Sequence, residues 1–258
     1  MPKKLNCISM KNLRQQYVNA IKEWQNRHPE FDYLDKWNKI NKFDDGKAAN
    51  SVEETIWCCN NSSIKPNGIL IMGINPSFNR EHIDVENRNF QEICQDSAKT
   101  KYWSTKKDMV DGILDATAYL DLFPIRMTKQ KDFMDDNNIP LSLKVDLLKV
   151  TRQEIESLHP RLIINPNMGS RYYWGIEKKT PWMGYEMKHF EDNHIGKQTN
   201  IYKIEKVQDN KDVICHEPTS LNGTKFLLAK YHGNGYGKGA LQKEDFLKFE
   251  DIRKILDL

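Results

Sequence analysis

The sequence has few of the features that mark membrane, secreted or metal-binding proteins. Its longest apolar run, within residues 69–74, is far too short to span a bilayer, and its first residues lack the apolar segment of a secretion signal. The 5 cysteines are an odd set without a C-x-x-C pair, which argues against a zinc site, an iron–sulfur cluster and a disulfide framework. The histidines show no metal-binding spacing either. We therefore expect a soluble, cytoplasmic protein with no metal and no other cofactor.

A large excess of one charge is also missing. The chain has 39 Lys and Arg residues against 36 Asp and Glu residues, a net charge of +3, so it is not a strongly basic protein that coats nucleic acid. Any contact with nucleic acid must come from a local patch. Aromatic residues, by contrast, are plentiful, with 6 Trp, 10 Tyr and 10 Phe, which excludes a disordered chain. A length of 258 residues suits one large domain or a core with an appendage.

The first part of the chain has the apolar spacing of helices. Apolar residues three and four apart predict a helix over residues 10–26 and a second over 33–40. A third is expected to begin at Ser51, with Glu54 at the spacing of a capping box, and to carry Cys58 and Cys59. We interpret residues 1–60 as a helical cover on a main domain of residues 61–258.

Beyond residue 60 the pattern changes to short apolar runs separated by helical stretches. Strands are predicted at 68–74, 116–123, 161–165 and 224–231, and helices at 104–115, 141–158 and 241–256. Residues 201–207 and 213–215 are rich in strand-forming residues, and they belong to a predicted insertion near 175–220. Strands that alternate with helices indicate an α/β fold. We expect three α/β/α layers with a central, mainly parallel sheet.

In such a sheet, ligands bind beyond the carboxyl ends of the strands. The loops 75–80, 123–126, 165–171 and 232–239 would share that edge if the strands are parallel. The first of them follows Gly73-Ile74-Asn75-Pro76, in which glycine admits a ligand close to the backbone, asparagine offers an amide, and proline stiffens the turn. The alternative is that Asn-Pro is only a common strand terminator, as at residues 165–166, and spacing alone favours it.

This tetrapeptide resembles the first motif of the uracil-DNA glycosylase superfamily, especially of its mismatch-specific, thymine-DNA-glycosylase-like branch. The order of other parts is similar: the aromatic pair Tyr102-Trp103, the segment YLDLFPIR at 119–126, the segment HPRLIIN at 159–165, and a last strand leading to His232. The resemblance covers roughly residues 66–245, and only GINP is specific. It implies an enzyme that flips a base out of DNA and hydrolyses its N-glycosidic bond.

The resemblance also implies roles for individual residues. Asn75 would hold the attacking water, and His232 would donate a hydrogen bond to the leaving base. Phe78 or Phe90 would stack on the base, with ordinary packing equally expected for Phe78 and favoured for Phe90. The implied base contacts also include Gly73, Ile74, Asp121 and Ser77, a small residue where uracil-specific members carry a bulky tyrosine.

Two positions depart from the family pattern. The family often has asparagine where this chain has Asp121, and an ionised carboxylate only accepts hydrogen bonds, so it prefers a base edge that offers N–H groups. The alternative is that Asp121 pairs with Arg126 or caps a neighbouring element. The loop HGNGYGKG at 232–239 replaces the expected His-Pro-Ser or Asn-Pro-Ser motif.

The predicted basic patch consists of Arg126, Arg171, Lys230 and Lys238. Arg171 is followed by the aromatic run Tyr172-Tyr173-Trp174, and we favour packing for Tyr173 and Trp174. The sequence thus predicts a DNA glycosylase that acts on a damaged, deaminated or modified base, with DNA as its partner. The alternatives are a catalytically silent nucleic-acid or nucleotide binder with the same fold, and a hydrolase of small nucleosides.

Overall fold

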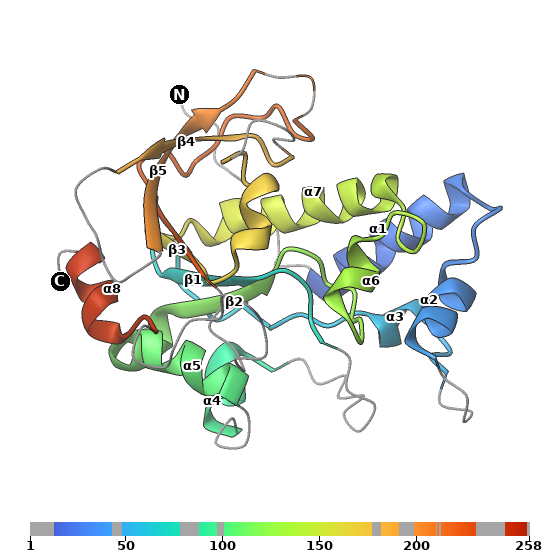
Figure 1. Cartoon of the computed structure of the whole chain (residues 1–258), viewed down its shortest axis with the longest axis horizontal. Helices are drawn as coiled ribbons and strands as arrows, with labels where there is room; N and C mark the ends of the chain where they lie inside the picture. The colour runs from blue at the N-terminus through green and yellow to red at the C-terminus, as the bar shows by residue number, and fades with distance from the viewer. Residues whose placement is uncertain are drawn as a thin grey trace.

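The protein is built on a six-stranded sheet with the strand order β2-β1-β3-β6-β5-β4 (Figure 1). The computed structural model describes residues 13–42, 48–77, 88–96, 101–176, 182–190, 199–209, 211, 213–230 and 246–256. Strands β1 (Ile69–Gly73), β2 (Thr117–Asp121), β3 (Leu162–Asn165) and β6 (Lys225–Ala229) are parallel. Strands β5 (Thr199–Val207) and β4 (Tyr185–His189) join antiparallel. The predicted α/β class and the mainly parallel sheet are confirmed.

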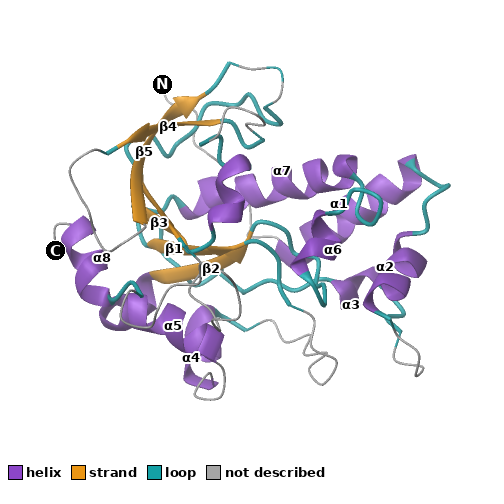
Figure 2. Cartoon of the chain, in the orientation of Figure 1, coloured by secondary structure: helices purple, strands orange, loops and turns teal. Residues whose placement is uncertain are grey.

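The parallel strands are buried on both faces, which is why they are almost continuously apolar. Leu70, Met72 and Ile163 face one hydrophobic cluster, which includes residues of helices α1 (Leu13–Arg27) and α7 (Leu141–Leu158). Ile71 and Ile164 face a second cluster, formed with helices α4 (Phe90–Asp96), α5 (Lys101–Val110) and α8 (Phe249–Leu256). Figure 2 shows helices on both sides of the sheet.

The predicted helices at 10–26, 33–40 and 141–158 correspond to α1, α2 (Tyr33–Asn41) and α7. The third prediction is wrong in extent, because α3 (Val52–Thr55) is a single turn. The Ser51 side chain makes no capping hydrogen bond, and Glu54 instead accepts one from the backbone of Asn50 at 2.9 Å. The chain leaves the helix because Ile56 forms a β-bridge with Ile125. Cys58 and Cys59 consequently lie in irregular chain.

Three further predictions need correction. The helix expected at 104–115 is α5 followed by a 3-10 helix, η2 (Asp111–Ala116), which contains the poor helix former Gly112. The last helix begins at Phe249, and residues 241–245 lie outside the described part. Residues 213–215 form no strand, because the carbonyl of Cys215 accepts a hydrogen bond from Arg152 instead. Helix α6 (Gln130–Met134), η3 (Met168–Tyr172) and β4 complete the described elements.

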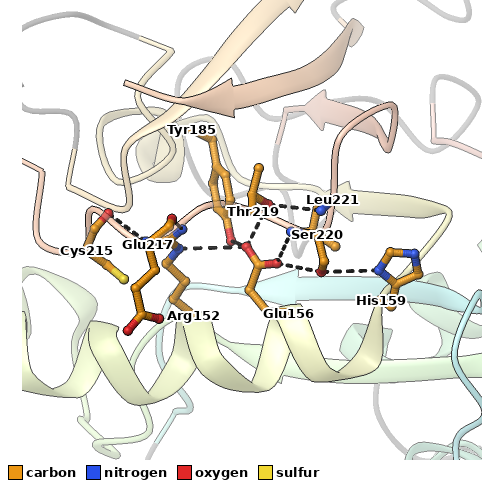
Figure 3. Close-up of polar contacts among 9 residues, drawn as sticks. All are labelled: Arg152, Glu156, His159, Tyr185, Cys215, Glu217, Thr219, Ser220 and Leu221. Carbon is orange, nitrogen blue, oxygen red and sulfur yellow. Dashed lines mark hydrogen bonds and ion pairs between the residues drawn. The ribbon is translucent and has the colours of Figure 1, made fainter. Parts of the chain in front are cut away.

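A polar cluster on α7 fastens the segment that leads into β6 (Figure 3). The buried Arg152 donates to the carbonyls of Cys215 and Glu217 at 2.7 and 2.8 Å. The carboxylate of Glu156 accepts hydrogen bonds from the backbone and hydroxyl of Ser220, the hydroxyl of Thr219 and that of Tyr185. We call this set the α7 clasp. It lies where α7 ends and β3 and β6 begin, at the edge of the sheet opposite to the strands' carboxyl ends.

Candidate functional site

The ends of β1 and β2 lie side by side. In the register of the two strands Gly73 is opposite Asp121. Beyond the strands, the backbone of Leu122 donates to the carbonyl of Gly73 at 3.1 Å, and that of Phe123 donates to the carbonyl of Ile74 at 2.9 Å. The loops that follow these two strands therefore start together at the carboxyl edge, as the sequence predicts.

Position 73 requires glycine because side-chain atoms of Asp121 and Tyr119 lie very close to its backbone. A Cβ atom at this position would lie 1.9 Å from Oδ1 of Asp121 and 2.4 Å from the hydroxyl oxygen of Tyr119. Both distances are far below van der Waals contact, so a larger residue would displace the carboxyl group. The glycine of the motif thus makes room for Asp121.

Substitution of Gly73 by alanine is expected to lower the free energy of unfolding by about 1–3 kcal/mol, because the displaced carboxyl loses its hydrogen bond to Tyr119. Urea unfolding measures this loss. In a protein that already carries Asp121→Ala, the same substitution should cost clearly less, since the nearest obstacle is gone. Equal costs in the two backgrounds would contradict the explanation.

The carboxyl group of Asp121 is buried, and only one of its two oxygens has a hydrogen-bond partner among the described residues. Its residue is 3% exposed, and its Oδ1 accepts a hydrogen bond from the hydroxyl of Tyr119 at 2.9 Å. That hydroxyl also meets the hydroxyl of Tyr102 at 2.7 Å. The second oxygen, Oδ2, is buried and has no hydrogen-bond partner among the described residues. Burial raises the pKa of Asp121 to about 7, against the opposing effects of the Tyr119 hydrogen bond and the charge of Lys106.

Lys106 reaches this cluster from α5. It is 2% exposed, and its Nζ lies 3.2 Å from the centroid of the Tyr102 ring, one turn earlier on the helix. Burial lowers the pKa of Lys106 to about 7, while the charges of Asp121 and Cys94 act in the opposite direction. A buried ammonium group and a buried carboxyl group thus share one apolar environment.

Aromatic rings form the walls of this environment. The ring of Phe90 stacks on that of Tyr119 at a centroid distance of 5.9 Å and an angle of 15°. Trp103 packs edge-on against Tyr119 at 4.9 Å, and Trp57 at 6.1 Å. Phe90 is 1% exposed, so it packs inside the protein, as the favoured alternative states.

Asn75 follows β1 at the same edge. Its side chain is partly exposed, its Nδ2 donates weakly to the carbonyl of Pro76 at 3.4 Å, and its Oδ1 is buried without a partner in the described chain. Two residues span at most about 7 Å, so Asn75 lies near Gly73 and hence near the carboxyl of Asp121. Ile74 points into the core, which leaves only its backbone for contact with a ligand. Ser77 is exposed.

The predicted basic residues lie in different environments. Arg126 is 6% exposed, and its carbonyl accepts a hydrogen bond from the indole of Trp37 at 2.8 Å. Arg171 is half-buried and donates to the carbonyl of Met168 and the hydroxyl of Tyr172. Lys230 is half-buried and directly follows β6. Phe78, His232 and Lys238 lie outside the described residues.

Two of the sequence-based alternatives are decided by the geometry. Asp121 bonds to Tyr119 and is acted on by the charge of Lys106, rather than pairing with Arg126. Tyr173 and Trp174 are 5% and 0% exposed, which confirms that they are packing residues.

Sequence reasoning missed Lys106, Tyr119 and Asn165. The signals were present: Tyr102 and Lys106 are four apart on a helix, and Tyr119 and Asp121 are two apart on a strand, so each pair shares a face. Asn165 ends β3, is fully buried, and has no partner for either amide atom within the described structure. Because side chains alternate along a strand, Asn165 lies on the same face of the sheet as Ile163, whereas Asp121 lies on the other face.

Other possible sites are less suited to chemistry. One surface cavity, of about 600 Å³, lies between α1 and the start of α7 and is lined in part by Trp24 and Val145, and another, of about 380 Å³, lies between α1 and α2 and is lined in part by Ile21 and Leu34. The described part of the chain contains no group of three or more His, Cys, Asp or Glu that could hold a metal ion. Within the same residues, no helix is long and apolar enough to cross a membrane.

No protein-family model matches the chain, and no curated protein is found to be similar. The candidate site therefore rests on its own geometry: Gly73, Asn75 and Asp121 at two adjacent strand ends, with Tyr102, Lys106 and Tyr119 behind them.

Proposed function

We propose that the protein is a DNA glycosylase-like hydrolase that cleaves the N-glycosidic bond of a damaged, deaminated or modified base, on a three-layer α/β/α fold. One observation carries the proposal. At two neighbouring strand ends, Oδ1 of Asn75 and Oδ2 of Asp121 are buried, and both lack a hydrogen-bond partner among the described residues. Buried polar atoms normally have partners, so both suggest contacts made by a ligand.

The chemistry needs little more than these groups. The bond between C1′ and the base nitrogen breaks, and its electron pair leaves with the base, while the oxygen of a water bonds to C1′. Because the sugar becomes cation-like first, the enzyme chiefly positions this water and stabilises the departing base. Asn75 would hold the water through Oδ1. A carboxamide does not take up a proton, so the proton of the water goes to solvent, and we expect a slow enzyme.

Asp121 would recognise the base, and Arg171 and Lys230 would bind the DNA backbone close to it. An ionised Oδ2 accepts a hydrogen bond from an N–H group on the edge of the flipped base. Arg171 and Lys230 follow β3 and β6, and their charges would attract the neighbouring phosphates. A net charge of +3 fits such a local contact.

The test is release of a base from oligonucleotides that contain uracil, hypoxanthine or a mismatched thymine, followed by alkaline cleavage at the abasic site. We expect the wild-type protein to release at least one of them. Asn75→Ala should slow release more than about 100-fold, because the water is no longer held. The matched control is Asn222→Ala, since Asn222 is exposed and precedes β6 at the opposite edge of the sheet.

Three results would contradict the proposal in different ways. Unchanged release by Asn75→Ala would remove Asn75 from the reaction. Binding of the oligonucleotides without any abasic site would favour a catalytically silent binder. Hydrolysis of free nucleosides, with no affinity for duplex at low salt, would favour a nucleoside hydrolase.

A further inference from the structure

Within the described part of the chain, the buried ammonium group of Lys106 has no hydrogen-bond acceptor. Among the described residues its Nζ contacts aromatic rings, at 3.2 Å from the centroid of Tyr102 and 6.0 Å from those of Trp103 and Tyr119. An ammonium group carries three hydrogen-bond donors, and a ring face satisfies them only in part. A buried lysine is costly unless something in the site accepts those donors.

Asp121 does not accept a hydrogen bond from the ammonium group of Lys106. The carboxylate acts on Lys106 through its charge, and no hydrogen bond or ion pair joins the two side chains. Asp121 has its own unused group, the buried Oδ2. The same apolar environment thus offers a donor and an acceptor that do not use each other.

A leaving base presents the complementary groups. When the N-glycosidic bond breaks, negative charge spreads over the base and gathers on a carbonyl oxygen. The carboxylate of Asp121 alone would oppose that charge, so a site built on it needs a nearby cation. Lys106 is the cation whose charge acts on Asp121.

We propose that Lys106 is a catalytic residue that donates a hydrogen bond to the carbonyl oxygen of the leaving base, while Oδ2 of Asp121 accepts one from the adjacent ring N–H. This inference rests on the proposed function. The electron pair of the broken bond stays on the base, Lys106 stabilises it without needing to transfer its proton, and solvent later protonates the base.

The test compares leaving groups. Each natural base is paired with a more acidic analogue of the same shape, 5-fluorouracil for uracil and 2-fluorohypoxanthine for hypoxanthine, in the same oligonucleotide. Lys106→Met should slow release of the natural base by about 100- to 1000-fold. It should slow release of the analogue much less, because that anion needs less stabilisation. A merely structural role would lower both rates by the same factor.

Two further variants complete the experiment. Lys106→Gln keeps an N–H donor without charge, so its loss should be smaller than that of Lys106→Met, and it serves where the methionine variant does not fold. Lys107→Met, the next residue of α5, is the matched control and should leave both rates unchanged. Equal losses on natural base and analogue overturn the role of Lys106 alone. A wild-type protein that releases none of the bases overturns the proposed function and this inference with it.

Discussion

Replacing Asp121 by asparagine is expected to stabilise the protein above neutral pH. Burial raises the pKa of Asp121 from 3.8 to about 7. The folded protein therefore keeps this proton over a pH range in which the unfolded chain has lost it, and the carboxyl's contribution to stability falls as pH rises from about 4 to about 7. The shift corresponds to roughly 4 kcal/mol, a loss that asparagine, which does not titrate, avoids.

Urea unfolding at about pH 5 and at about pH 8.5 measures this difference. We expect the variant to exceed the wild type in stability by a small margin at the lower pH and by a clearly larger one at the higher pH. Burial also lowers the pKa of Lys106 to about 7, so its contribution to stability rises above that pH. The charge of Asp121 opposes this lowering, so in the variant the rise begins at a lower pH and adds to the same difference. Asp108→Asn on the exposed side of α5 is the control, with no change expected. The same difference at both pH values would exclude titration of Asp121 as its cause.

The variant should also release the base more slowly, since the neutral amide oxygen of asparagine accepts a hydrogen bond less strongly than the carboxylate does. A residue that lowers the stability of the folded protein, and whose replacement would raise it, is typical of a functional site. Stability and activity are therefore expected to move in opposite directions at Asp121. A variant that is less stable and equally active would count against both the titration and the proposed role.

The sequence predicted the parts of the fold whose cause is local. The β1 run ILIMG is apolar throughout because both of its faces are buried, and α7 is an 18-residue amphipathic helix. Strand β4, with the sequence YEMKH, was not predicted as a separate element. Only its first residue is buried, and its place is decided by pairing with β5, far along the chain.

The residues of the candidate site likewise fall into those that local sequence predicts and those that tertiary packing brings together. Asn75 and Asp121 were predicted because each ends a strand or follows one directly. Lys106 was not, because its relation to Asp121 arises only when α5 packs on the sheet. Arg126 was expected on a surface patch, yet α2 covers it, and the indole of Trp37 bonds to its carbonyl. Residue type and spacing do not show which cations tertiary packing buries.

The α7 clasp should affect stability without affecting the site. Glu156→Ala removes the acceptor of four hydrogen bonds, from Tyr185, Thr219 and two groups of Ser220, at distances of 2.7–3.0 Å. It also removes the charge that faces the guanidinium of Arg152 at 3.8 Å. With the side chain of Glu156 21% exposed, we expect a loss of about 2–4 kcal/mol in the free energy of unfolding.

Glu156→Gln should lose less, since it keeps the shape and part of the hydrogen bonding, and Gln153→Ala on the exposed face of α7 should change little. Urea unfolding gives the order of the three variants. Hydrogen exchange at the amide of Ser220 should accelerate in Glu156→Ala, because that amide donates to the lost carboxylate at 2.8 Å. The clasp lies at the edge of the sheet opposite to Asn75 and Asp121, so base release per folded molecule should be preserved. A loss of activity with no loss of stability would mean that the clasp, and not only the carboxyl edge, takes part in function.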